Sequence, residues 1–351
     1  MADTKLKVGD VTFTPAELSK TYQTYRKELI VQPMLAMDKL LQHCSVRTGI
    51  RYRETVTEMS GTFEIGNYKK DKKHNADVNF DGRVLETFFG NCVETIDPNA
   101  IYQSIWGSDI TKGDGLRNVP YVVQVCAYIL KKLGERLYMN AFTAKHDGTV
   151  FDKTASFFNG FKTIIDNDIA GTNENKKVYI SESLGNLYYF NESLTKENAE
   201  DALKDFYWSE NISDVLRNQD LKMFINSRLY HFYTEAYQTR HGALPYNQSY
   251  DKRVLEGAEN VELVPLSCVP MDFMLLTPKN NILLLYNQKT ADENYIVERS
   301  LDNHYDVDFI GNLFFGTQFE SVSPEVFAVA IKKQCSQVGG VRFPRTLPPI
   351  I

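Results

Sequence analysis

The clearest helical pattern in the chain runs from residue 119 to residue 144. Apolar side chains recur there at helical spacing while charged side chains occupy the opposite face, and the apolar stripe consists of Cys126, Ile129, Leu130, Leu133 and Leu137. Pro120 falls in the first turn, where proline is tolerated, and His146–Gly148 supplies a turn after the end. The pattern predicts one long amphipathic helix, of roughly 38 Å at 1.5 Å per residue.

A distinctive stretch before this helix has the pattern of two strands that fold back on each other. Phe63–Ile65 and Val78–Phe80 alternate apolar and polar positions on either side of the hydrophilic stretch Tyr68–Asn75, and two further extended runs flank them, Arg51–Met59 and Val84–Ile96. We expect a long hairpin with a charged tip, whose limbs reach on the order of 50 Å at about 3.3 Å per residue. A lone two-stranded hairpin is marginal in water, so such an arm needs a surface to lie on, for which another subunit is a candidate.

The N-terminal region predicts two short helices. Thr14–Glu17 is a capping box with proline at the first helical position, and apolar residues follow at helical spacing until Pro33 breaks the run. A second amphipathic helix is expected over Met34–His43. The two helices either pack as a surface pair on the core or form an arm that contacts neighbouring subunits.

From residue 155 onwards helices and strands are mixed. A helix or a turn is expected over 162–168. Helices are expected over 195–208 and 211–218, and from Arg228, where Asn226 is placed to act as the cap. Extended apolar runs predict the strands Leu221–Ile225, Val261–Leu266, Phe273–Thr277, Ile282–Tyr286, Asn294–Ser300 and Val307–Phe319, and a further apolar run covers Val326–Ile331. The fold class expected from this pattern is α+β.

Composition narrows the class of protein. The chain has 351 residues, of which 43% are hydrophobic and 24% charged, which is ordinary for a folded protein of two or three domains. A net charge of -6 argues against tight, saturating binding of nucleic acid through phosphate contacts. The five cysteines include no C-x-x-C pair, which favours free thiols. Without a signal-like segment or an apolar run of membrane-spanning length, we expect a protein made in a cytosol with no membrane contact.

Candidate catalytic chemistry is absent from the sequence. No phosphate-binding, dinucleotide-binding, zinc-protease or nucleophile-elbow motif occurs, and the six histidines form no short-range ligand set with Cys or acidic residues. The acidic pairs Asp166/Asp168 and Asp306/Asp308 are of the type that holds a divalent ion, but alternating acids are more often a solvated face. We therefore expect no catalytic residue, no cofactor and no metal site.

The order of the predicted parts resembles the major capsid proteins of tailed bacteriophages, which have the Hong Kong 97-like fold. Three stretches carry the resemblance. The first, Met223–Tyr233 continuing to Gly242, resembles a strand, Asn-containing turn and helix of that family, and the second, Val264–Leu284, resembles a later strand, turn and strand segment. The third, Asn303–Phe319 with Ser323–Ala330, resembles the closing strands. The likeness covers most of the chain.

The resemblance implies an α+β architecture with an N-terminal arm, a long E-loop β-hairpin, a spine helix, and peripheral and axial domains. It divides the chain into a helical N-terminal arm over 1–48, the E-loop hairpin over 49–97, the peripheral domain with the spine helix over 98–154, the axial domain over 155–300, and closing strands with a C-terminal tail over 301–351.

The function that the resemblance implies is that of a non-enzymatic shell subunit, which self-assembles through hexamers and pentamers into the icosahedral capsid enclosing phage double-stranded DNA. Its partners would be a separate scaffolding protein, a portal, decoration proteins and DNA held without sequence-specific contacts, and its location the virion, after assembly in the host bacterial cytoplasm. The E-loop tip would contact a neighbouring subunit through Tyr68, Lys69, Lys70, Lys72 and Lys73. Some relatives form a Lys–Asn isopeptide bond between subunits, but no partner Asn and Glu can be matched here, so we expect noncovalent contacts.

Two other functions stay open at this point. An encapsulin-like bacterial compartment shell resembles the same fold but encloses cargo enzymes. A protein of another class, a soluble α+β enzyme without a local signature, would be monomeric or dimeric and would have a deep polar pocket.

Overall fold

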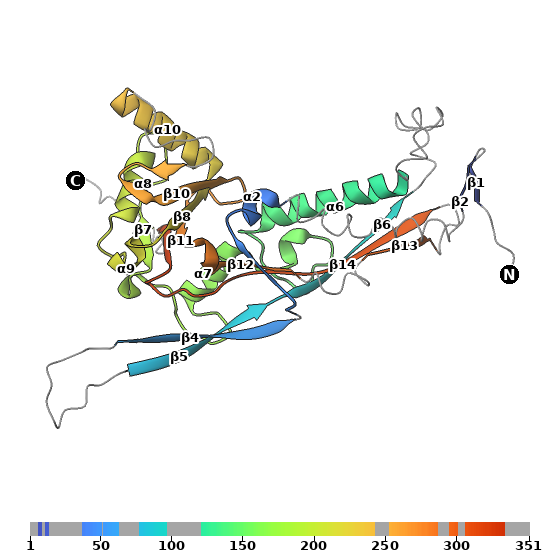
Figure 1. The fold of residues 1–351 in the computed structure, drawn as a ribbon, viewed down its shortest axis with the longest axis horizontal. Coiled ribbons are helices and arrows are strands. Elements are labelled where there is room, and N and C mark those ends of the chain that lie inside the picture. The colour runs from blue at the N-terminus through green and yellow to red at the C-terminus, as the bar shows by residue number, and fades with distance from the viewer. Residues whose placement is uncertain are drawn as a thin grey trace, which may run out of the picture.

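The computed structural model describes residues 6–8, 11–13, 37–50, 52–62, 77–96, 121–242, 253–286, 295–300 and 306–333. The molecule is elongated (Figure 1). A lobe of helices and short strands lies at one end, a long strand pair and a long helix run away from it together, and a hairpin crosses beneath the lobe. No helix in these described ranges is long and apolar enough to cross a membrane.

A six-stranded mixed sheet forms the centre of the lobe, in the order β7-β15-β11-β8-β10-β9. Its strands are β7 (Leu187–Phe190), β15 (Ala328–Lys332), β11 (Phe273–Thr277), β8 (Leu221–Asn226), β10 (Ala258–Leu266) and β9 (Val254–Leu255). The helices α8 (Ala199–Tyr207), α9 (Asp214–Arg217) and α10 (Ser227–His241) belong to this lobe. One apolar cluster, which includes Leu203, Phe206, Leu229 and Tyr233, joins α8 and α10 to the sheet.

The turn from β8 into α10 confirms the predicted strand, cap and helix. The Asn226 side chain accepts a hydrogen bond from the backbone N–H of Arg228 at 2.8 Å and so caps the helix. At the other end, Gly242 is left-handed with φ 69° and terminates α10.

A second sheet carries the elongated part of the molecule. Its central strand, β14 (Val307–Phe319), pairs on one edge with β13 (Tyr295–Arg299) and β12 (Ile282–Tyr286), and β12 in turn pairs with β3 (Ser45–Thr48). The opposite edge of β14 pairs with β6 (Phe88–Ile96) over nine residue pairs. The residues of β12 and β13 therefore lie in a different sheet from most of the 155–300 stretch.

The long helix α6 (Tyr121–Asn140) confirms the predicted helix, although it ends at Asn140 and not at residue 144. Its fully buried Leu137 belongs to the apolar cluster that also contains Leu313 and Phe315 of β14. The short helix α2 (Asp38–Leu41), the helix α7 (Phe161–Ala170) and the strand ends complete the core. An aromatic row joins these elements, with ring centroids 4.8 Å apart for Phe158 and Phe315 and 5.2 Å apart for Phe161 and Phe319. The remaining described elements are β1 (Leu6–Val8) and β2 (Val11–Phe13), which pair with each other, and the 3-10 turns Thr154–Ser156, Glu182–Leu184 and Lys279–Asn281.

The predicted hairpin is present but its second limb was placed wrongly. β4 (Arg53–Thr62) pairs antiparallel with β5 (Asp77–Glu86), from Arg53 opposite Glu86 to Thr62 opposite Asp77. The chain then passes Thr87 and continues as β6, which pairs with β14 instead of with the first limb. The expected limb Val84–Ile96 thus ends at Glu86, because β6 pairs along β14 and Phe88 at its start packs against the main core.

Two helices begin later than expected, because side-chain oxygens accept hydrogen bonds from the backbone N–H groups near their starts. The Asn198 side chain accepts a hydrogen bond from the backbone N–H of Thr195 at 2.7 Å, so α8 begins at Ala199 and not at residue 195. In the same way Ser213 accepts from the N–H of Val215, and α9 is confined to four residues. The helix predicted over Met34–His43 is reduced to α2 in its described part, and the helix predicted from Thr14 lies outside the described residues.

Candidate functional site

The β4–β5 hairpin is the most conspicuous feature of the surface. In the part of the chain that the structure describes, neither strand pairs with any other strand, so the hairpin is a two-stranded sheet by itself. Its foot is apolar: Leu85 is fully buried against Ile50, Leu283 and Leu285. From this foot the hairpin runs beneath the lobe (Figure 1).

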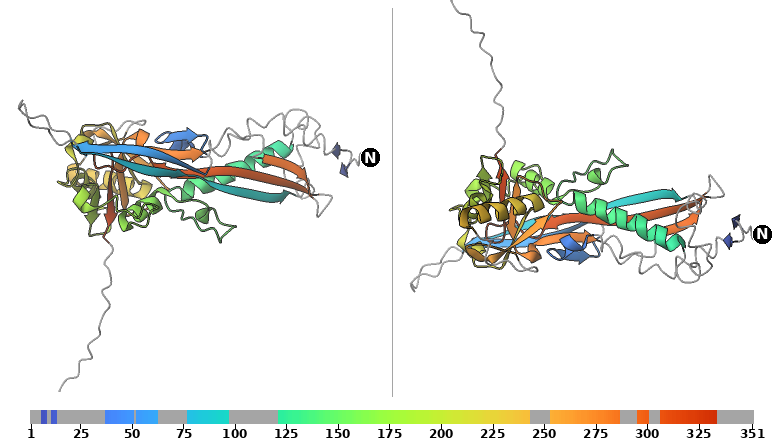
Figure 2. Two further views of the ribbon diagram at one scale, coloured as in Figure 1. Left: turned by 90° about the horizontal axis from the view of Figure 1, so that it is seen from below. Right: turned by 90° about the horizontal axis from the view of Figure 1, so that it is seen from above.

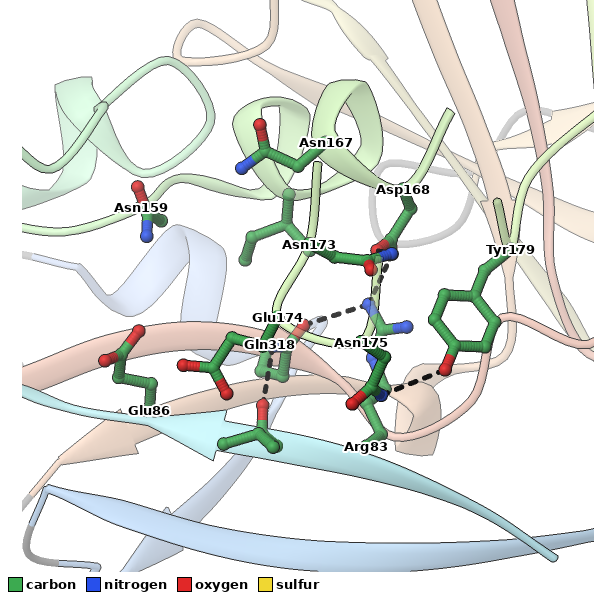
Figure 3. Close-up of a pocket in the computed structure, with 12 residues that line it drawn as sticks. Arg83, Glu86, Asn159, Asn167, Asp168, Asn173, Glu174, Asn175, Tyr179 and Gln318 are labelled. Atoms are coloured by element: carbon green, nitrogen blue, oxygen red, sulfur yellow. Dashed lines mark hydrogen bonds and ion pairs between the residues drawn. The ribbon is translucent and has the colours of Figure 1, made fainter. Parts of the chain in front are cut away.

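One buried ion pair fixes the hairpin to the body. Arg83 of β5 lies with its Nη2 2.7 Å from Oδ2 of Asp168 in α7, and the two side chains are only 11% and 5% exposed. The same Nη2 donates a hydrogen bond of 3.1 Å to Oε1 of Gln318 in β14. Figure 3 shows Arg83 pointing away from its strand towards these two partners. A single guanidinium therefore connects the hairpin, a helix and the long central strand.

Backbone groups of the hairpin are also held by side chains of the body. Gln318 Nε2 donates to the carbonyl oxygen of Val84 at 2.9 Å, and Asn175 Nδ2 donates to that of Gly82 at 3.0 Å. These side chains and the ion pair surround a small cavity of about 110 Å³. We call Arg83, Asp168, Gln318 and Asn175 the hairpin anchor.

The loop that supplies Asn175 is itself ordered by Asp168. The second carboxylate oxygen of Asp168 accepts a hydrogen bond from Asn173 Nδ2 at 3.0 Å, and Asn173 bonds the backbone of Lys177 through both its oxygen and its nitrogen. Asp168 therefore orients both the arginine and the loop. Loss of this carboxylate would disturb two contacts to the hairpin at once.

The energetics of a buried pair explain what the hairpin anchor does. The attraction between the two charges in the interior roughly offsets the cost of removing both from water. Deleting one partner leaves an unpaired buried charge and lowers the stability of the fold by about 3–5 kcal/mol. Arg83 Nε is buried without a hydrogen-bond partner among the described residues, so the pairing is not fully satisfied. Any other orientation of the hairpin would leave these charges unpaired. The anchor therefore selects one orientation of the hairpin and adds little to the net stability of the fold.

A second, exposed set of charges lies at the end of the hairpin nearest the body. Arg53 pairs with Glu86 across the strands at 2.7 Å and with Glu174 at 2.8 Å, while its own side chain is 59% exposed. The hydrogen bonds that Arg53 donates to the Glu86 carboxylate raise the pKa of Arg53. Exposed pairs of this kind contribute little to stability because solvent screens them.

The foot of the hairpin has a tight backbone. Tyr52 is left-handed with φ 64°, which is rare for a residue with a side chain, and its carbonyl accepts a 2.7 Å hydrogen bond from the N–H of Thr87. Its ring lies edge-on to Phe314 with 5.4 Å between centroids. A Cβ on Gly316 would stand 2.3 Å from the carbonyl oxygen of Glu86, so only glycine allows β14 to pass here. The exit direction of the hairpin is therefore set by the backbone as well as by the anchor.

Comparison with known proteins identifies the fold but not a sequence family. No protein-family model and no curated protein matches the chain. Among solved structures, a chain of the cyanophage A-1(L) capsid matches with a TM-score of 0.55 at 13% identity, over 86% of this chain and 92% of that one. A chain of the capsid of a native GTA particle matches with a TM-score of 0.52 at 12% identity, over 84% and 89%. A chain of the satellite phage P4 procapsid matches with a TM-score of 0.50 at 12% identity, over 94% of each chain.

The chain has the fold of phage capsid proteins. The matches extend over most of the chain, and the resemblance stated from the sequence is confirmed at the level of the fold. The coarse α+β class is confirmed with it.

The contact residues expected from the sequence and the residues of the hairpin anchor are different sets. Tyr68, Lys69, Lys70, Lys72 and Lys73 lie outside the described residues, and their contact role remains a prediction. Sequence reasoning missed the hairpin anchor, because Arg83 is 85 positions from Asp168 and 235 from Gln318. The only local signal was the Asp166/Asp168 pair, which was considered for a metal ion.

The acidic pairs have protein partners in the structure. Asp166 pairs with Lys162 one helical turn away, Asp168 pairs with Arg83, and Asp308 accepts a hydrogen bond from Thr95. Within the described ranges, no group of three or more His, Cys, Asp or Glu side chains is arranged to hold a metal ion.

Proposed function

We propose that this chain is a major capsid protein, which assembles with copies of itself into the icosahedral shell that encloses the double-stranded DNA of a tailed phage. The observation that carries the proposal is the anchored two-stranded hairpin in a fold shared with phage capsid chains. A hairpin without a third strand is marginal in water, and a neighbouring subunit would supply the missing surface.

The parts named by the resemblance are assigned to the structure as follows. The β4–β5 hairpin is the E-loop, α6 is the spine helix, the sheet centred on β14 belongs to the peripheral domain, and the six-stranded sheet with α8–α10 is the axial domain. The N-terminal arm expected over 1–48 would end before β3 (Ser45–Thr48), since β3 pairs with β12 in this peripheral sheet. The E-loop tip, with Tyr68, Lys69, Lys70, Lys72 and Lys73, contacts a neighbouring subunit noncovalently.

The hairpin anchor has a clear purpose in a shell subunit. Closed shells repeat the same contacts by symmetry, so an arm that reaches a neighbour must leave its own subunit in one direction. Over ten residues at about 3.3 Å each, a tilt at the foot becomes a displacement of many ångströms at the far end. A buried ion pair and a glycine-dependent backbone crossing limit such a tilt.

The proposed partners follow from the assembly. The chain forms hexamers and pentamers with itself, a separate scaffolding protein guides them, and a portal and decoration proteins complete the particle. DNA is enclosed without sequence-specific contacts, in keeping with the net charge of -6. The protein is assembled in the bacterial host cytoplasm and remains in the virion.

Negative-stain electron microscopy of the expressed protein, with and without the candidate scaffold encoded next to it, tests the proposal. Closed shells, or hexamer and pentamer rings, are expected. A uniformly small, compact particle under both conditions would contradict it and would make an α+β enzyme the next hypothesis. Shells that copurify with a bound cargo enzyme, and not with phage proteins, would indicate an encapsulin-like compartment.

A further inference from the structure

A loop between α6 and α7 presents a large apolar side chain to solvent. Phe151 is 91% exposed, more than any other large apolar side chain among the described residues. Figure 2 shows this loop projecting sideways from the body. A single exposed apolar side chain is ordinary, so its meaning depends on whether further apolar surface lies beside it.

The loop is held by a dense set of hydrogen bonds. Its two sides are joined from Lys145 N to Ala155 O at 2.9 Å and from Asp147 N to Ser156 O at 3.0 Å. The Asp147 carboxylate accepts from both the N–H and the hydroxyl of Thr149, at 2.9 and 2.7 Å, and these bonds lower its pKa. The position of Phe151 is thus supported by the fold of its loop.

Next to Phe151 lies a groove of about 440 Å³ between the loop, β6 and α6. Five consecutive residues of β6, from Phe89 to Val93, line it, so the groove follows the edge of the strand. This edge has no partner strand within the described part of the chain, since β6 pairs only with β14 there. Side chains alternate along β6, so Gly90 and Cys92 lie on the face where Leu133 and Phe157 contribute apolar surface to the groove, whereas Phe89 packs against Phe314 on the other face.

We propose that this surface binds the same surface of a second copy of the chain, with Phe151 of each copy inserted into the groove of the other. This inference rests on the proposed function, which places many copies side by side. The knob and the groove lie on one surface, as an isologous two-fold contact requires. The rim has charges of both signs, Asp147, Asp152 and Lys153, so two copies can pair them across the axis.

A native cysteine makes the contact testable by cross-linking. Cys92 lines the groove and is a free, partly exposed thiol. In the variant Val150→Cys, which keeps Phe151, the new thiol of one copy would approach Cys92 of the other. Copper phenanthroline with oxygen would then oxidise the two thiols, which lose two protons and two electrons to form one disulfide.

The expected result is a dimer band on a non-reducing gel that is well above the wild-type background, disappears with reductant and is absent in Val150→Cys/Cys92→Ser. A Val150→Cys protein that yields only monomer, including one with a disulfide inside a single chain, would overturn the proposal. The gel is read on all soluble protein, whether or not shells form. Shells without the cross-link overturn only this contact, whereas the cross-link without shells overturns only the proposed function.

A loss-of-contact variant provides the second measurement. Phe151→Ser should reduce the yield of closed particles at least tenfold while the melting curve stays unchanged, because the side chain is almost fully exposed. Val215→Ser is the matched control, since Val215 is 51% exposed on α9 in the lobe and its loss should leave particle yield unchanged. Equal particle yields from Phe151→Ser and the wild type would contradict the proposal.

Discussion

Arg83 and Asp168 are 85 residues apart in the chain, yet Nη2 of the one lies 2.7 Å from Oδ2 of the other in a site that is almost closed to solvent. This pair joins the hairpin to α7, and Gln318 extends the connection to β14. Because both charges are buried, each depends on the other. A buried ion pair in the body of the protein therefore fixes the orientation of the long surface hairpin.

Removing one partner of this ion pair should destabilise the folded protein. We expect Arg83→Met to lower the free energy of unfolding by about 3–5 kcal/mol, because the Asp168 carboxylate is then left buried without its cation. Chemical denaturation measures this. The double variant Arg83→Met/Asp168→Asn should recover a large part of the loss, since no unpaired charge remains and the amide oxygen can still accept from Asn173.

The control for this prediction is an exposed pair on the same helix. Lys162→Gln removes the partner of Asp166, whose side chain is 48% exposed, and should cost only about 0.3–0.5 kcal/mol. Equal losses from Arg83→Met and Lys162→Gln would contradict a special role for the hairpin anchor.

The close passage of β14 at Gly316 past the foot of the hairpin gives a second prediction. Gly316→Ala should lower the free energy of unfolding by about 1–3 kcal/mol and lower the yield of closed particles, because its Cβ would meet backbone and not a flexible side chain. Gly148→Ala is the matched control for the free energy of unfolding, since the nearest atom to its added Cβ is at 4.0 Å. Normal particles from Gly316→Ala would show that the foot tolerates a tilt.

How much of this arrangement the sequence could predict depends on the range of the interactions. The helix α6 and the turn from β8 into α10 follow from local periodicity and from the Asn226 cap, and both were predicted. The change of partner at Thr87, where the chain leaves the hairpin and pairs with β14, was not predicted. The alternation of residues along a strand does not indicate which other strand it pairs with. The hairpin anchor was missed for the same reason: Arg83, Asp168 and Gln318 meet only after two sheets and a helix have packed.

His43 gives a prediction for pH dependence. Its Nδ1 lies 3.1 Å from Lys222 Nζ and 3.7 Å from Glu262, with the charge of Lys279 also acting on it, and burial followed by Lys222 lowers its pKa. The folded protein therefore binds this proton less readily than the unfolded chain does. The stabilisation is fully present above the ordinary histidine pKa of about 6.5 and is lost progressively as the pH falls below it.

Urea denaturation at a series of pH values between 5 and 8 measures this effect. In the wild type, stability should fall as the pH drops below about 6.5, and His43→Gln should make the decline shallower because glutamine does not titrate but can still accept from Lys222. His231→Gln, at a side chain that is 72% exposed, serves as the control and should keep the wild-type slope. An unchanged slope in His43→Gln would exclude His43 as the source.

The described thiols should differ in reactivity. Burial raises the pKa of Cys268 to about 12 and that of Cys44 further still, whereas Cys92 is only partly buried and its pKa is raised less. Because the thiolate is the reactive form, we expect iodoacetamide at pH 8 to label Cys92 well before Cys44 and Cys268, which should react only on unfolding. Peptide mapping by mass spectrometry separates the sites, and early labelling of Cys44 would contradict the described core.

A cryo-electron-microscopy reconstruction of the particles formed by the wild-type protein tests the central claim most directly. The account predicts a closed shell in which the β4–β5 hairpin of each subunit lies on a neighbouring subunit while Arg83 remains paired with Asp168 of its own chain. A monomer or small oligomer with the hairpin in contact only with its own subunit would contradict it.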